Sequence, residues 1–244
     1  EIEDTLLLSL LHPEVYDNIA KKTRKCFEPN QPRAVLFEGP PGCGKTSSAR
    51  VVAAKASVPL VYVPLEVIGS KYYGESERIL SSIFQACEDL DGCLVFLDEV
   101  DALATVRSSD MHEATRRTLS VLLREMDGFN KKSRGRSVVV AATNRKQDLD
   151  PALISRFDMM IKFDLPDEAC RRSILECYAC HLTLSELSQL ARESTGMSGR
   201  DLRDLCQQTE RRWASKVLRG VVKGGLDSVP GLQEYLKSFE IKIE

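Results

Sequence analysis

The sequence predicts an α/β fold, a parallel five-stranded sheet with flanking helices, followed by a small all-helical lid. Short apolar runs typical of strands buried on both faces alternate with stretches of helical periodicity. The pattern changes at residues 165–167 (LPD), after which only helical patterns follow. A glycine-rich segment joins the first apolar run to a helical pattern. The expected domains are therefore an α/β domain over residues 1–165 and a helical lid with a C-terminal tail over residues 166–244.

The elements of the first domain follow from these patterns. Two short helices are expected at 6–11 and 14–24, and the loop EPNQP at 28–32 leads to the first strand. Strands are expected at 33–37, 60–63, 93–97, 137–142 and 159–163. Helices are expected at 47–56, 76–88 and 114–126, the last closed by Asp127-Gly128, and a short one starts at Asp150-Pro151. The basic turn at 131–136 (KKSRGR) is interpreted as a solvated loop.

The second domain is expected to contain helices alone. Their predicted ranges are 167–180, 185–193 and 198–218, with Gly224-Gly225 ending that run and a last helix over 230–239. The segment contains the pattern C-x-x-C-H at Cys177, Cys180 and His181, which also occurs where haem is attached. Because it lies inside a helical stretch, helix thiols are the favoured interpretation, with haem as the alternative.

Composition excludes several classes of protein. The chain has 244 residues, 43% hydrophobic and 29% charged, with a formal net charge of −2, which does not favour a general nucleic-acid surface. No apolar run approaches the length of a membrane span. The first residues, EIEDTLLLSLL, lack the basic start of a signal peptide, and a chain that begins at Glu1 is expected to be an excised fragment. Eight cysteines in regular patterns are expected to be reduced thiols, which predicts an intracellular protein.

The glycine-rich segment reads GPPGCGKT and fits G-x-x-x-x-G-K-[ST], the signature of a P-loop NTPase. Its glycines let the backbone turn N–H groups toward phosphate oxygens, and the following helix adds the positive end of its dipole. Lys45 is expected to reach the β- and γ-phosphates, and the Thr46 hydroxyl to ligate Mg²⁺. The predicted nucleotide-binding residues are Gly39, Pro40, Pro41, Gly42, Cys43, Gly44, Lys45, Thr46 and Ser47.

Three further segments follow or precede predicted strands. Asp98 at the end of the third strand is expected to hold Mg²⁺ through water, and Glu99 to polarise the attacking water. Asn144 after the fourth strand could orient that water or touch the γ-phosphate, with an Asx-turn cap as the alternative. Arg156 before the fifth strand could reach a neighbouring subunit's nucleotide, with a surface salt bridge to Asp158 or Asp150 as the alternative.

Taken together, GPPGCGKT, LVFLDEVD, AATNR and LDPALISRFD, in this order, resemble the AAA+ ATPase family over nearly the whole chain. The lid segment GMSGRDL, together with HEATRR and LLREMDGF, is similar to the AAA subgroup that includes katanin, spastin and the proteasomal ATPases. The resemblance implies ATP and Mg²⁺ as cofactors, Asn144 as the first sensor, Arg156 as the finger, and a hexameric ring of identical subunits. It also implies that Arg116 and Arg117 face the subunit interface, and that the backbone near residues 2–5 reads adenine.

The resemblance also implies a loop that grips a protein or peptide substrate. The segment KYYGESE resembles the family's pore loop, with Tyr72 as the gripping residue, Tyr73 as its partner and Gly74 giving mobility. A partly buried packing tyrosine is the alternative for Tyr72. An ordinary solvent-facing arginine is the favoured interpretation for Arg107, with a place in a second pore loop as the alternative.

Two positions depart from the family pattern. The segment ALISRFD is two residues shorter than the usual ALLRPGRFD and carries a single arginine. Arg200 stands where many members have Ala or Ser, and either contacts phosphate as a second sensor or is exposed or salt-bridged. The function predicted is an ATP-hydrolysing ring motor that remodels or threads proteins. The alternatives are a slowly cycling, nucleotide-gated scaffold that does not thread, and a nucleic-acid-dependent ATPase, which the charge balance disfavours.

Overall fold

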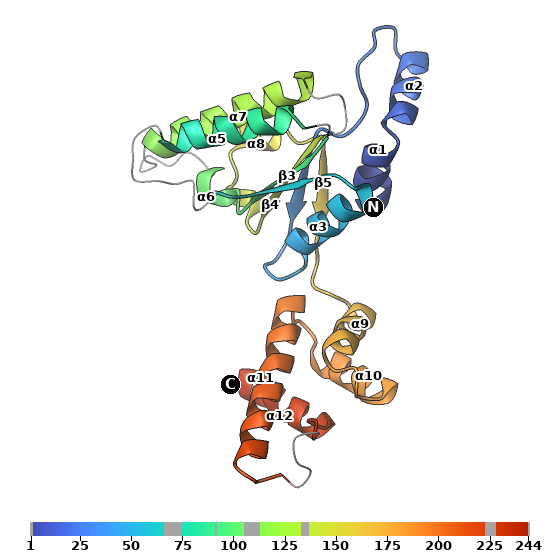
Figure 1. Cartoon of the computed structure of the whole chain (residues 1–244), viewed down its shortest axis with the longest axis vertical. Coiled ribbons are helices and arrows are strands. Elements are labelled where there is room, and N and C mark those ends of the chain that lie inside the picture. Colours follow the sequence, from blue (N-terminus) through green and yellow to red (C-terminus); the bar gives the residue numbers. More distant parts are fainter. Residues whose placement is uncertain are drawn as a thin grey trace. The chain divides into compact units, whose positions relative to one another are not determined.

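The computed structural model describes residues 2–65, 75–90, 92–104, 113–132, 137–222 and 228–243. The chain divides into two compact units (Figure 1). Unit 1 comprises residues 1–39 and Lys45–Phe163, and unit 2 comprises Pro40–Gly44 and Asp164–Glu244. The expected pore-loop residues Tyr72, Tyr73 and Gly74, Arg107, residues 133–136 of the basic turn, and Gly224-Gly225 lie outside the described residues.

Unit 1 is built on the predicted sheet, which has five parallel strands in the order β2-β3-β4-β1-β5. The strands are β1 Ala34–Glu38, β2 Leu60–Pro64, β3 Leu94–Asp98, β4 Val138–Thr143 and β5 Met159–Lys162. The predicted fold class is thereby confirmed, and each strand lies within one or two residues of its predicted range. The order places β1 between β4 and β5, so the chain leaves β1 and crosses over to reach the far edge strand β2.

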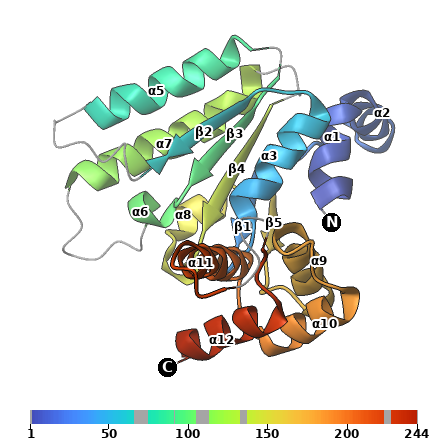
Figure 2. The ribbon, with the colours of Figure 1, turned by 60° about the horizontal axis from the view of Figure 1, so that its bottom comes forward.

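Helices cover both faces of the sheet (Figure 2). Alternating side chains of the strands supply two separate cores, one on each face. Leu36, Val95 and Leu97 pack with helices α5 (Glu75–Glu88), α7 (Glu113–Lys132) and α8 (Pro151–Ile154). Val35, Phe37 and Phe96 pack with α3 (Lys45–Ala56), α1 (Leu8–Leu11) and the π-helical segment η1 (Glu3–Leu7). Both faces of the sheet are therefore covered, as continuous apolar strands require.

The remaining helices that the structure describes in unit 1 are short or peripheral. They are α2 Pro13–Thr23, α6 Asp101–Ala104 and the 3₁₀ turn η2 Lys146–Asp148. Of these, α6 and η2 were not expected from the sequence; each follows directly on a strand end. The predicted short helix after Asp150 is confirmed, because the Asp150 carboxylate accepts a hydrogen bond from Ala152 N at 2.8 Å and caps α8.

The prediction that Asp127-Gly128 closes the helix was wrong, since α7 continues to Lys132. A glycine inside a helix costs roughly 1 kcal/mol. Phe129 comes directly after that glycine, is 1% exposed, and meets the Phe84 ring edge to face with centroids 5.4 Å apart. Burial of a phenylalanine stabilises by about 2 kcal/mol, which outweighs the glycine and keeps the helix going.

Unit 2 contains the predicted helices α9 Glu168–Tyr178, α10 Leu184–Glu193, α11 Gly199–Leu218 and α12 Leu232–Ile243. The side chains of Asp167, Thr183 and Ser198 cap the amino-terminal ends of α9, α10 and α11, respectively. Thr183 forms a capping box with Glu186, and Ser198 forms one with Asp201. Leu175, Leu190, Leu202 and Tyr235 contribute to a core of their own. In the part of the chain that the structure describes, no helix is both long and apolar enough to cross a membrane.

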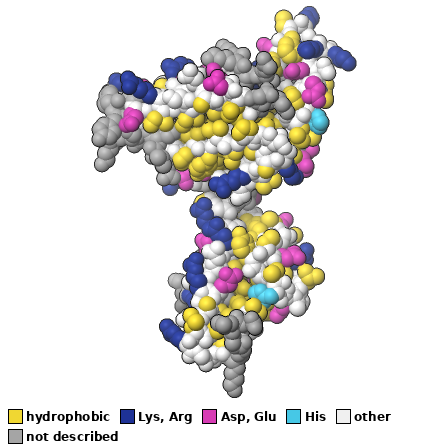
Figure 3. Space-filling model, in the orientation of Figure 1, with side chains coloured by type: hydrophobic (Ala, Val, Ile, Leu, Met, Phe, Trp, Pro, Cys, Tyr) yellow, Lys and Arg dark blue, Asp and Glu magenta, His cyan; other side chains and the backbone are white. Residues whose placement is uncertain are grey.

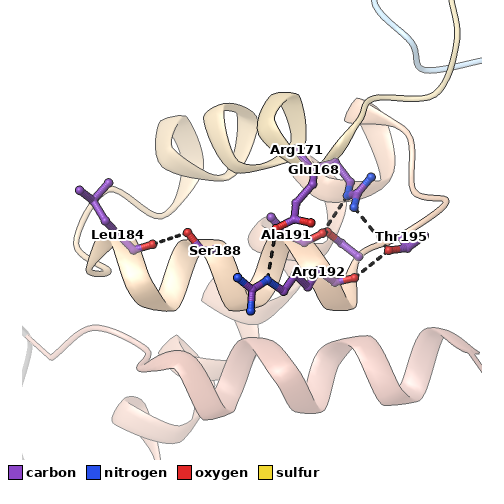
Figure 4. A network of polar contacts seen from close by, with 8 residues as sticks. Glu168, Arg171, Leu184, Ser188, Ala191, Arg192 and Thr195 are labelled. Carbon is purple, nitrogen blue, oxygen red and sulfur yellow. Dashed lines mark hydrogen bonds and ion pairs between the residues drawn. The ribbon is translucent and has the colours of Figure 1, made fainter.

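A buried arginine ties these helices together (Figure 4). Arg171, 6% exposed, extends from α9 and donates to Ala191 O at 2.9 Å, to Pro166 O at 2.8 Å and to Thr195 Oγ1 at 3.4 Å. On the surface beside it, Arg192 forms an ion pair with Glu168. Through this guanidinium, α9 is therefore bonded both to the segment just before it, at Pro166, and to the end of α10, at Ala191.

Candidate nucleotide site

The predicted nucleotide-site residues of unit 1 gather at one edge of the sheet. Parallel strands end at the same edge, and ligands of such sheets bind beyond it. Glu38 of β1 is opposite Thr143 of β4, so the residues that follow these strands are neighbours. Asp98 ends β3, which pairs with β4 on its other side. The register therefore brings the phosphate-loop segment, Asp98 and Asn144 to adjacent strand ends.

Gly39 opens the loop in a backbone conformation that requires glycine. Its φ is +147°, and a Cβ at this position would lie 2.0 Å from the carbonyl oxygen of Phe163. Its N–H donates to Thr143 O at 3.3 Å, which joins the loop to the end of β4. Gly42 and Gly44 also have positive φ, +77° and +94°. The chain can thus turn sharply and bring backbone N–H groups close to an anion.

Lys45 is the first residue of α3 and is only 8% exposed. A buried ammonium needs hydrogen-bond partners. Its Nζ donates to Gly39 O at 2.7 Å and to Asn144 Oδ1 at 2.8 Å. The cation is thereby fixed at the mouth of the loop, between two strand ends.

Thr46 and Asp98 bring two oxygen groups together. Thr46 Oγ1 donates to Asp98 Oδ2 at 3.2 Å, and Glu99 N donates to Asp98 Oδ1 at 3.1 Å. A hydroxyl and a carboxylate are the ligands that Mg²⁺ prefers, directly or through water. Together with Lys45, these groups of unit 1 fit a magnesium-bound nucleoside triphosphate.

Glu99 is held in a left-handed backbone conformation, with φ of +54°. The turn is fixed on its far side, because Val100 N donates to Ala142 O at 3.0 Å. Asp101 then starts α6 and accepts a hydrogen bond from Thr143 Oγ1 at 2.9 Å. The backbone at Glu99 is therefore determined by its neighbours on β4, which accounts for a conformation that costs about 1 kcal/mol for a residue with a Cβ.

Asn144 is exposed after β4, and its amide oxygen accepts from Lys45. The turn that follows is capped by Thr143 instead, whose hydroxyl accepts from Arg145 N at 3.0 Å. The contact with Lys45 is therefore the role that the structure gives to the Asn144 side chain.

Arg156 lies at the opposite edge of the sheet, since it precedes β5 and the strands are parallel. The salt bridges to Asp158 or Asp150 weighed from the sequence do not form. Arg156 instead forms an ion pair with Asp127 at 3.1 Å and donates to Ala152 O at 3.0 Å. Asp158 instead accepts from the N–H groups of Arg33 and Ala34, at 2.6 and 3.1 Å, where β1 begins.

A cavity of about 340 Å³ opens beside Arg156. It is lined by Arg33, Ala34, Met126, Asp127, Ser155, Arg156 and Asp158. Arg116 and Arg117 are both exposed on α7 and, with Glu77, Ser120 and Val121, line a second hollow of about 340 Å³ between α5 and α7. These arginines are thus placed on the outside of unit 1. Residues 2–5 lie at the start of the chain and in η1, beside the core formed with α3.

Within unit 2, Pro40–Gly44 contact the start of α11. Arg200 N donates to Gly42 O at 3.2 Å, and a Cβ on Gly42 would lie 2.6 Å from Ser198 Oγ. The Arg200 side chain is exposed. Cys43 Sγ lies 3.9 Å from Pro41 O, and Ser47 is exposed in the first turn of α3.

The C-x-x-C-H pattern does not assemble into a metal site. Cys177 and Cys180 are exposed thiols, and His181 Nε2 lies 2.8 Å from Pro230 O. Among the residues that the structure describes, no three His, Cys, Asp or Glu side chains are grouped so that they could hold a metal ion. Cys177 lies in α9, but the helix ends at Tyr178 and not at residue 180 as predicted, so Cys180 and His181 follow it and only Cys177 is a helix thiol.

Tyr62 is a residue at this site that sequence reasoning missed. It lies on β2, and its hydroxyl donates to Asp98 Oδ2 at 2.9 Å. Two signals were available, an aromatic residue near the end of a predicted strand and an acid at the end of the next. They point to a contact only once it is known that β2 pairs with β3. In that pairing Tyr62 is opposite Phe96, two residues before Asp98.

Comparisons with known proteins agree with this geometry. The family model "ATPase family associated with various cellular activities (AAA)" matches residues 35–165. The proteasome-activating nucleotidase of Methanothermobacter thermautotrophicus is 38% identical over 216 residues, covering 85% of this chain and 50% of that protein. Spastin of Bos taurus is 34% identical over 210 residues, covering 84% of this chain and 33% of that protein.

Among solved structures, the FIGL-1 AAA domain in complex with ADP superposes with a TM-score of 0.81 and 25% identity. The match covers 98% of this chain and 79% of that chain. The chain spans half or less of the length of the curated relatives named above. The similarity therefore concerns a module that these longer proteins share.

Proposed function

Because the chain belongs to the AAA family of ATPases, we propose that it is the motor module of an ATP-hydrolysing protein that assembles into a ring and remodels or threads protein substrates. The observation that carries this proposal is a pair of hydrogen bonds at neighbouring strand ends. Lys45 donates to Asn144, and Thr46 donates to Asp98. Relatives that include proteasomal ATPases and spastin support the remodelling role.

The residues are assigned roles that their chemistry supports. The loop Gly39–Gly44 cradles the phosphates with backbone N–H groups, and Lys45 neutralises part of their charge. Thr46 and Asp98 hold Mg²⁺, which when bound supplies charge for the phosphate oxygens. Glu99 accepts the proton of the attacking water, and Asn144 orients that water while it keeps Lys45 in place.

Completion of the site in trans is proposed for Arg156. Its place at the amino-terminal edge of the sheet keeps it away from Lys45 of its own chain. A guanidinium on that outer edge can stabilise transition-state charge only in a neighbouring copy. Arg116 and Arg117 are proposed to face the same neighbour, and Arg200 to sense the γ-phosphate. Six copies in a ring is the arrangement that the family supports.

The grip on substrate is proposed for Tyr72, Tyr73 and Gly74, with Arg107 in a second loop. This assignment rests on their resemblance to the family's pore loops. An intracellular location is proposed as well, in keeping with eight cysteines that are all free thiols. Figure 3 is in line with a protein rather than a nucleic-acid partner, because acidic and basic side chains are interspersed over the visible face instead of forming one basic field.

A mixing experiment tests completion in trans. Arg156→Ala keeps its own nucleotide-binding residues but lacks the finger, whereas Glu99→Gln keeps the finger but lacks the base. Each variant alone is expected to hydrolyse ATP at most about a hundredth as fast as the unchanged protein, as loss of a key transition-state group implies. Mixed in equal amounts they should regain part of the activity, which should rise steeply with protein concentration. A mixture no more active than its parts would overturn the trans assignment.

Substitution of Tyr72 separates a threading motor from a nucleotide-gated scaffold. Turnover stimulated by an unfolded protein should fall in Tyr72→Ala and be kept in Tyr72→Phe, because the aromatic ring does the gripping. Basal turnover should be similar in all three proteins. If stimulation is the same in Tyr72→Ala, the scaffold is the better description.

A further inference from the structure

Tyr62 occupies an unusual position on the edge strand β2. Its ring is stacked on Phe96 of β3, with centroids 6.0 Å apart and planes at 15°. Phe96 is fully buried, whereas Tyr62 is 45% exposed. One face of the tyrosine therefore rests on the core while its hydroxyl reaches along the sheet to Asp98 Oδ2, 2.9 Å away.

The Asp98 carboxylate receives three hydrogen bonds. Oδ1 accepts from Glu99 N, and Oδ2 accepts from both Thr46 Oγ1 and Tyr62 Oη. Thr46 belongs to the phosphate-loop helix, and its hydroxyl is itself a proposed magnesium ligand. Tyr62 belongs to another strand and has no such second task. Its hydrogen bond can therefore persist on Oδ2 whichever group Thr46 contacts.

We propose that Tyr62 is a positioning residue, which holds Asp98 in the orientation that binds magnesium with the nucleotide. Outer partners of metal-binding carboxylates typically fix their rotamer, and their loss costs about 10- to 100-fold in metal affinity or activity. The inference rests on the proposed binding of Mg²⁺ and ATP. It adds a residue from β2, which lies outside every motif that relates this chain to its family.

Tyr62→Phe tests the hydroxyl alone, because phenylalanine keeps the ring that stacks on Phe96. The measurement is the Kd of a fluorescent ATP analogue, once with excess Mg²⁺ and once with EDTA. The ratio of the two constants gives the contribution of magnesium to binding and requires no turnover. We expect this ratio to fall about 10-fold in Tyr62→Phe, with an unchanged Kd in EDTA.

Tyr178→Phe is the control. It also removes a tyrosine hydroxyl, from an exposed side chain at the end of α9 in unit 2, to which no role in nucleotide binding is assigned. Its magnesium ratio should equal that of the unchanged protein. An unchanged ratio in Tyr62→Phe, or an equal loss of affinity in EDTA, would overturn the positioning role.

The same experiment distinguishes this inference from the function on which it rests. If the unchanged protein itself binds the analogue equally well with Mg²⁺ and with EDTA, the proposed metal-nucleotide site is wrong. If the unchanged protein depends on magnesium and Tyr62→Phe depends on it equally, only the role of Tyr62 is wrong. Titration with Mn²⁺ in the presence of ADP, followed by electron paramagnetic resonance, gives the affinity for the metal itself. The Kd of Mn²⁺ should rise about 10-fold in Tyr62→Phe, as is typical when an outer partner of a metal ligand is lost.

Discussion

Lys45 Nζ donates a hydrogen bond of 2.8 Å to Asn144 Oδ1, across 99 residues of sequence. The bond joins the phosphate-loop helix to the end of β4, with Gly39 O as the second acceptor of the same ammonium. The residue expected to orient water and the residue expected to hold phosphate are thus in direct contact before any ligand is considered. A ligand that draws the ammonium away would release the Asn144 amide for a new partner.

Asn144→Ala is expected to separate binding from hydrolysis. Lys45 keeps Gly39 O as an acceptor, so the Kd for ATP should change by less than about threefold, the loss of one modest hydrogen bond. The turnover number should fall about 100-fold, because a fixed polar group at the reacting centre is lost. Gln147→Ala, an exposed change three residues on, is the control. Equal losses in binding and turnover would contradict this division of roles.

Replacement of Arg171 should destabilise unit 2. Its described acceptors are two carbonyls and a hydroxyl. Arg171→Leu leaves the carbonyl of Pro166 without the guanidinium that donates to it, whereas Ala191 O keeps the Ser194 hydroxyl as a donor at 3.1 Å. A loss of about 2 kcal/mol in the free energy of unfolding is expected, for one orphaned carbonyl and one lost hydrogen bond. Trp213, the only tryptophan of the chain, lies in α11 and reports urea unfolding of this unit by fluorescence. Arg172→Leu, an exposed neighbour, should unfold at nearly the same urea concentration as the unchanged protein.

Tyr235→Phe is expected to stabilise the same unit. The Tyr235 ring is fully buried, and its hydroxyl has no hydrogen-bond partner among the residues that the structure describes. Burial raises the pKa of Tyr235, so the hydroxyl stays neutral but remains unpaired. Its removal should increase the free energy of unfolding by about 1 kcal/mol.

Thr209→Val provides the contrast for Tyr235. The Thr209 hydroxyl is also buried but donates to Leu205 O and lies 2.9 Å from Ser238 Oγ. Its loss should destabilise by about 1 kcal/mol. Thermal unfolding of the two variants should therefore shift in opposite directions, and a shift in the same direction would show that the Tyr235 hydroxyl has a partner after all.

Glu234 should make unit 2 sensitive to acid. The hydrogen bond from Lys216 is the main cause that lowers the pKa of Glu234 below its ordinary value of 4.5. A lowered folded-state pKa gives stability that is fully present above the unfolded value and is lost as pH falls through the folded value. Glu234→Gln should therefore be less stable at neutral pH and show a smaller loss of stability between about pH 5 and about pH 3. Glu176→Gln, on an exposed side chain, is the control for urea unfolding at each pH.

The sequence predicts most of what depends on local pattern. The strands, the glycine loop, and Asp98 and Asn144 at the ends of their strands follow from apolar runs and from the rule that parallel strands end at one edge. The pairing of Tyr62 with Asp98 was beyond such reasoning, because it requires the order of β2 and β3 in the sheet. The partner of Arg156 was missed for a related reason. The sequence predicted that the helix ends at Asp127. In the structure α7 continues past the buried Phe129 to Lys132, and Asp127 lies on its surface, where it pairs with Arg156.

The left-handed backbone at Glu99 has a consequence for how this protein can change. Glycine would adopt a φ of +54° without the steric cost that a Cβ imposes. A chain selected for heat resistance alone would therefore lose its glutamate at this position and gain stability, but it would lack the group proposed as the base. With Glu99 in that proposed role, heat tolerance and turnover compete at one residue, whose side chain opposes the preference of its own backbone.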